Sequence, residues 1–125
     1  MAPDPYYYDV FSPLRIKFYS YGLPLNEKGV LNVIHAARSD IETHDIEAPI
    51  NQSEITFRDW KYRLVELALR PQRQVTWLQW EATTLAMHFF IEAYDTVEMK
   101  FDVEIDGSLA LGTGTLIRGV GVAGW

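Results

Sequence analysis

The chain has 125 residues, a formal net charge of -6 and no cysteine. This length suits one domain that buries about two thirds of the surface exposed by its unfolded chain, so no cofactor is needed for folding. The lack of cysteine excludes disulfides and thiolate sites, and the acidic balance argues against nucleic acid, whose phosphates are bound by clustered Lys and Arg.

The first 13 residues predict an arm outside the regular elements. Three prolines interrupt this segment, and its aromatic side chains would need a surface to pack on: Tyr6, Tyr7, Tyr8 and Phe11. The segment lacks the basic and apolar regions of a secretory signal, and no apolar run in the chain is long enough to cross a bilayer. We therefore expect a cytoplasmic protein without a membrane partner.

A strand and a helix are predicted next. Leu14, Ile16 and Phe18 alternate with more polar residues, which is the two-residue period of a strand with one face in the core. Asn26 is a good N-cap, and apolar residues follow at helical spacing: Val30, Val33, Ile34, Ala37 and Ile41. Because this apolar stripe is narrow, we expect a helix at the surface.

Residues 40–53 are acidic and predict a fraying helix end followed by a solvated loop. The acidic run lacks the glycine that a calcium loop requires, so we expect no metal site there. Ile55 and Phe57 then open a short strand. Residues 60–69 fit either a strand or a helix, and Pro71 ends the element in both cases. We favour the strand, because the following helix then has a second strand to lie beside.

A second helix is predicted from about Val75 to Tyr94. Apolar residues cover most of its circumference, and one of its stripes contains Leu78, Leu85 and Phe89. A helix of this kind is buried on more than one side. Since one sheet can cover only one side, we expect a further element or another subunit against the rest.

The segment from Val97 to Ile105 carries the clearest strand signal, because apolar residues alternate strictly with charged ones. Asp106-Gly107 suits a two-residue hairpin turn, and in that register Phe101 lies opposite Gly112. Glycine weakens the middle of a strand unless something approaches its backbone. We therefore expect a helix or an aromatic ring over Gly112 and Gly114, with the preceding helix as the nearest candidate.

Together these elements predict an α+β fold. We expect a two-layer sandwich, in which a mixed or antiparallel sheet of four or five strands carries two helices on one face. A single domain would span residues 14–118, between the N-terminal arm of residues 1–13 and an apolar, glycine-rich tail of residues 119–125.

The segment 77–114 also resembles small uncharacterised proteins of filamentous fungi, which end in a Trp-bearing helix followed by a hairpin with a Gly-x-Gly strand. The residues that carry this resemblance are Trp77, Ala86, Phe90, Phe101, Gly112 and Gly114. The segment covers about a third of the chain. The shared motif is structural, so the resemblance implies no activity.

Candidate chemistry is confined to the second helix. His88 and Glu92 lie four residues apart, with Glu81 two turns earlier on the same polar line, and such a set could transfer protons. An ordinary i,i+4 pair at the solvated edge of the helix is the simpler interpretation, because no partner from elsewhere completes a site. The glycines of the tail have dinucleotide spacing but no following helix to hold a pyrophosphate, so we expect no cofactor and no metal.

We therefore predict a non-enzymatic, self-associating structural or scaffold protein, which forms a homo-oligomer or a filament. The reason is a surplus of apolar surface in a chain that is 14% aromatic. The contacts would come from the two ends of the chain: Tyr6, Tyr7, Tyr8, Phe11, Val120, Val122 and Trp125. The alternative is a cofactor-independent small-molecule-binding protein, isomerase or lyase, with His88 as acid or base and Glu92 or Glu81 orienting it.

Overall fold

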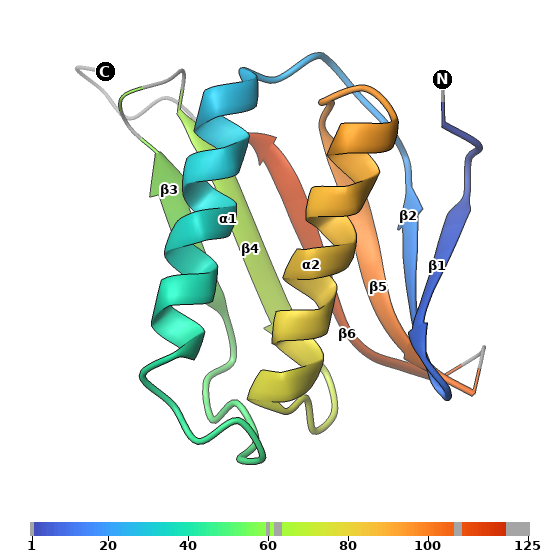
Figure 1. Ribbon diagram of the computed structural model, residues 1–125, viewed down its shortest axis with the longest axis vertical. Coiled ribbons are helices and arrows are strands. Elements are labelled where there is room, and N and C mark those ends of the chain that lie inside the picture. Colours follow the sequence, from blue (N-terminus) through green and yellow to red (C-terminus); the bar gives the residue numbers. More distant parts are fainter. Residues whose placement is uncertain (1, 60, 62–63, 107–108, 120–125) are drawn as a thin grey trace.

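The computed structural model describes residues 2–59, 61, 64–106 and 109–119. Six strands form one open antiparallel sheet in the order β1-β2-β5-β6-β4-β3, with two helices on one face (Figure 1). The strands are β1 (Tyr6–Phe11), β2 (Leu14–Tyr19), β3 (Ile55–Asp59), β4 (Val65–Pro71), β5 (Met99–Ile105) and β6 (Leu109–Arg118), and the helices are α1 (Glu27–Ile41) and α2 (Trp77–Ala93). The α+β prediction is confirmed, but the sheet has six strands instead of four or five.

The additional strand is β1, which lies where we expected an irregular arm. Tyr6 pairs with Phe18 and Tyr8 pairs with Ile16, so residues 6–11 form the edge of the sheet beside β2. The prolines flank this strand instead of interrupting it, and proline is tolerated at strand ends. Half-buried and exposed residues alternate along β1, which places one of its faces on the core. The prediction of an arm outside the regular elements is therefore wrong.

The hairpin of β5 and β6 forms as predicted, but its register differs. Ile105 pairs with Leu109, so three residues separate the strands instead of two. A further irregularity after Val103 adds one residue to β6. As a result, Phe101 lies opposite Gly114 and not opposite the predicted Gly112.

Gly114 explains why β6 contains glycine at its centre. A Cβ atom at this position would collide with the ring of Phe101 and with the backbone oxygen of Ala68. The predicted aromatic ring over a glycine is thus confirmed, although this ring comes from the neighbouring strand and not from the preceding helix.

The uncertain stretch before Pro71 is a strand from Val65 onward, as we favoured. β4 lies between β3 and β6, so its backbone is paired on both sides. Val65, Leu67 and Leu69 are fully buried on the face that α1 covers. An inner strand of this kind is apolar along most of its length, which made its period hard to distinguish from that of a helix.

Both helices begin at side chains that cap backbone N–H groups. Asn26 Oδ1 accepts a hydrogen bond from the N–H of Gly29 at 3.1 Å, as predicted. Thr76 and Gln79 form a capping box, with Thr76 Oγ1 accepting from the Gln79 N–H at 3.2 Å and Gln79 Oε1 accepting from the Thr76 N–H at 2.9 Å. In the described part of the chain, no helix has the length and apolar character needed to cross a membrane.

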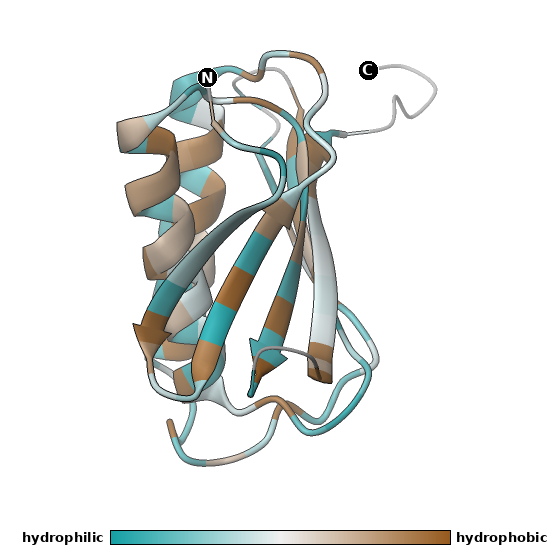
Figure 2. Cartoon of the chain, turned by 90° about the vertical axis from the view of Figure 1, so that its right-hand side faces the viewer, coloured by the Kyte–Doolittle hydropathy of each residue, from teal (hydrophilic) through white to brown (hydrophobic). Residues whose placement is uncertain are grey.

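The core lies between the helical layer and the sheet (Figure 2). Its largest fully buried side chains include Trp80 and Phe90 from α2 and Phe18 and Phe101 from the strands. The ring centroids of Phe18 and Phe90 are 4.8 Å apart. Figure 2 also shows brown and teal residues alternating along the strands, as expected for a sheet with one face in the core.

Candidate functional site

α2 leaves a stripe of large apolar side chains on the surface of the molecule. Leu78, Leu85 and Phe89 are 39%, 38% and 43% exposed. They lie seven and four residues apart, so they share one side of the helix. With the small Ala82 they form a 4-3-4 spacing, which is that of a coiled-coil seam. The sheet therefore covers only part of this helix, and the described residues supply no further element over the stripe.

β1 extends this stripe to the edge of the sheet. The ring of Tyr8 stacks on Phe89, with ring centroids 6.0 Å apart. Tyr7 and Phe11 point to the other face of β1 and are 42% and 45% exposed. We call the surface on the helical side the apolar strip, which consists of Leu78, Leu85, Phe89 and Tyr8.

The backbone of β1 adds a second kind of contact to the apolar strip. β1 pairs with β2 on one side and, within the described residues, with no strand on the other. An edge strand presents N–H and C=O groups that can pair with another chain. Lysine commonly protects such edges, but the one charged side chain of β1 is Asp9.

The structure distributes the predicted contact residues differently from our expectation. Tyr6 packs on its own core, where its ring centroid lies 5.6 Å from that of Phe90 and 5.3 Å from that of Tyr94. Burial raises the pKa of Tyr6, and Tyr94 adds to the effect. Tyr6 thus holds β1 onto α2 of the same chain. The other predicted contacts, Val120, Val122 and Trp125, lie outside the described residues.

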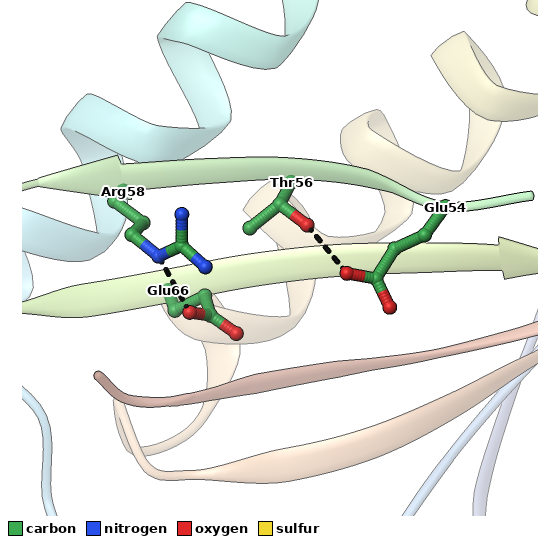
Figure 3. Close-up of polar contacts among 4 residues, drawn as sticks. All are labelled: Glu54, Thr56, Arg58 and Glu66. Atoms are coloured by element: carbon green, nitrogen blue, oxygen red, sulfur yellow. Dashed lines mark hydrogen bonds and ion pairs between the residues drawn. The ribbon is translucent and has the colours of Figure 1, made fainter. Parts of the chain in front are cut away.

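The opposite, open face of the sheet is polar, and many of its charges are paired. On β3 and β4, Arg58 Nε donates to Glu66 Oε2 at 2.8 Å (Figure 3). Glu54 accepts hydrogen bonds from Thr56 at 3.0 Å (Figure 3) and from Arg70 at 2.7 Å. Ion pairs of this kind suit a surface in water, so this face offers a partner less apolar area than the apolar strip does.

The same open face continues across β2 and β5. Arg15 donates to the buried Glu104 at 3.2 Å, and the hydroxyl of Tyr19 donates to Asp102 at 2.9 Å. Burial raises the pKa of Tyr19 to about 12, with further contributions from Asp102 and Glu104. These contacts join neighbouring strands and have a structural role.

The predicted His88–Glu92 pair forms on α2. His88 Nε2 and Glu92 Oε1 are 2.7 Å apart, and both side chains are reached by solvent. Glu81 makes no side-chain hydrogen bond or ion pair with either residue. The described residues contain no group of three His, Cys, Asp or Glu side chains that could hold a metal ion. This geometry matches an i,i+4 pair at a helix edge.

His88 also lines a groove of about 320 Å³ between the two helices. The other lining residues come from α1 and are Leu31, Ile34, His35 and Arg38. Sequence reasoning missed His35 and Arg38 as site residues. The sequence does show two basic side chains one turn apart beside the apolar stripe of α1, which could have suggested a site. Only the fold, however, brings them next to His88.

No protein-family model, curated protein or solved structure matches this chain. The resemblance of residues 77–114 to fungal proteins therefore stays a prediction from the sequence.

Proposed function

We propose that this chain is a self-associating structural protein, in which the apolar strip of one copy packs on the apolar strip of a second copy. The observation that carries the proposal is the exposure of Leu78, Leu85 and Phe89 on a helix whose other side forms the core. Contiguous exposed apolar surface of this kind is typical of contact sites.

Two features of the apolar strip favour a second copy as its occupant. The free edge of β1 can pair antiparallel with the β1 edge of another molecule. The 4-3-4 spacing on α2 can likewise pack against the same spacing on a second α2. Because each contact joins identical segments, both can form around one two-fold axis.

This proposal changes the contacts that we expected from the sequence. Of the predicted N-terminal contacts, Tyr8 belongs to the apolar strip, Tyr7 and Phe11 lie on the other face of β1, and Tyr6 packs on the core of its own molecule. Leu78 and Leu85, which we did not predict as contact residues, take a central part. A closed dimer is the form that a two-fold contact produces, and a filament would require a head-to-tail contact instead.

The test measures the molar mass of the protein in solution by size-exclusion chromatography with light scattering. We expect a dimer for the wild type and a monomer for Leu85→Gln, because this change places an amide at the centre of the apolar strip. Leu23→Gln is the matched control, since Leu23 is 63% exposed and lies outside the strip. It should remain dimeric, and circular dichroism should show that both variants are folded.

A wild type that stays monomeric over the whole accessible concentration range would contradict the proposal. A Leu85→Gln variant with the same mass as the wild-type dimer would show that the contact lies elsewhere. A mass that grows with concentration beyond the dimer would favour the filament.

A further inference from the structure

Arg38 differs from the arginines of the open sheet face in having no acidic partner among the described residues. Arg15, Arg58 and Arg70 each contact a carboxylate at 3.2 Å or less. The guanidinium of Arg38 makes no hydrogen bond or ion pair with a described residue, and its Nη1 atom is buried. A buried donor without a partner costs free energy. Such a group needs an explanation, and a bound ligand is one.

The surroundings of Arg38 indicate the chemistry of that ligand. Arg38 lines the groove between α1 and α2 together with His35 and His88, so three nitrogen-bearing side chains meet there in a protein of net charge -6. No carboxylate lines the groove within the described residues, and the neighbouring Glu92 is already bonded to His88. The polar groups of the groove therefore suit an anion.

The remaining lining is apolar. Leu31 is half-buried and Ile34 is buried, and both lie along the same side of α1 as Arg38. The groove volume of about 320 Å³ is at the lower end of the range for ligand pockets. An inorganic anion would leave the exposed part of Leu31 uncovered, whereas an anion with a short hydrocarbon body would cover it.

We propose that this groove binds a small organic acid, with its carboxylate on Arg38 and its hydrocarbon body on Leu31. The planar guanidinium can donate two parallel hydrogen bonds to one carboxylate. This binding site is independent of the apolar strip, so the self-association proposal can fail without affecting it.

The test uses sodium hexanoate as the probe in an NMR titration of backbone amides. We expect saturable shifts at residues 31–38 and around His88. Two control ligands should bind at least about tenfold more weakly than hexanoate. Hexanamide has the same hydrocarbon body without the charge, and inorganic phosphate has charge without the body. A charged hydrogen bond and apolar burial each contribute more to binding than a tenfold change in affinity requires.

Two variants of Arg38 separate a ligand role from a structural one. Arg38→Met keeps the aliphatic stem and should lose the saturable shifts, while its melting temperature should not fall, because an unpartnered guanidinium has been removed. Arg38→Lys keeps the charge without the planar fork and should weaken hexanoate binding several-fold. Arg73→Met is the matched control, since Arg73 is exposed and lies outside the groove. This substitution changes the net charge by the same amount as Arg38→Met.

Leu85→Gln should bind hexanoate as the wild type does, which distinguishes this site from the apolar strip. The proposal is overturned if hexanoate shows no saturable shifts, if hexanamide or phosphate binds equally well, or if Arg38→Met binds like the wild type. A lower melting temperature for Arg38→Met would also overturn it, because Arg38 would then stabilise the fold without a ligand.

Discussion

Gly114 shows how a single residue sets the spacing of three strands. The ring of Phe101 on β5 and the carbonyl of Ala68 on β4 both approach the backbone of β6 at this point. Gly112 has more room, because an added Cβ atom would lie 3.2 Å from the Arg70 oxygen and 3.3 Å from Val75 Cγ2. The two glycines therefore tolerate a side chain to different degrees.

We expect Gly114→Ala to lower the free energy of unfolding by roughly 2–4 kcal/mol, because the new methyl group meets the backbone oxygen of Ala68 and the buried ring of Phe101. Gly112→Ala serves as the comparison and should change it by on the order of 1 kcal/mol or less. Urea unfolding followed by tryptophan fluorescence measures both values. Equal effects at the two positions would contradict this explanation.

Tyr19 gives the stability of the protein a dependence on alkaline pH. Burial, followed by the contact with Asp102, raises the pKa of Tyr19 from the ordinary 10.0 to about 12. The folded protein therefore holds this proton more tightly than the unfolded chain. The resulting stability is fully present below about pH 10 and is lost as the pH rises toward 12.

We expect the Tyr19→Phe variant to lose less stability than the wild type as the pH rises from 10 to 12. Part of the slope should remain, because burial and Asp4 raise the pKa of Tyr21 to about 12 as well. Urea midpoints measured from neutral to alkaline pH provide the test. A variant whose midpoint falls as steeply as that of the wild type would show that Tyr19 does not contribute.

The elements that could be predicted are those with a long, regular apolar period. β5 was recognisable because charged residues separate all its apolar ones, and α1 because Asn26 caps a clear apolar stripe. β1 was not recognised, since aromatic residues occupy both of its faces and prolines stand at both of its ends. The hairpin register depends on an irregularity that packing of the whole sheet decides, and the local sequence does not reveal it.

Of the two candidate sites, one could be predicted from a local sequence pattern and the other could not. The apolar surplus of α2 can be read from its sequence, because polar residues are too few to cover its outer side. The interhelical groove cannot, since His35 and Arg38 lie on α1 and His88 lies on α2. With no pattern linking the two helices, only the structure shows that these side chains meet.

At the scale of the whole molecule, a net charge of -6 makes copies of the chain repel one another. The proposed contact is apolar, so salt weakens this repulsion without weakening the contact. We expect the dimer dissociation constant to fall as sodium chloride rises from about 0.02 M to about 0.5 M. Sedimentation equilibrium measures it, and a contact that loosens with added salt would indicate ion pairs across the interface instead.

The order of the strands has a consequence for how the protein comes into being. The hairpin of β5 and β6 is the third in sequence, yet it occupies the middle of the sheet. In the sheet, β5 pairs with β2 of the first hairpin, and β6 pairs with β4 of the second hairpin. The first two hairpins are therefore joined only through the third. A ribosome therefore releases both flanks before the hairpin that joins them, and the sheet cannot close until β5 and β6 have been synthesised.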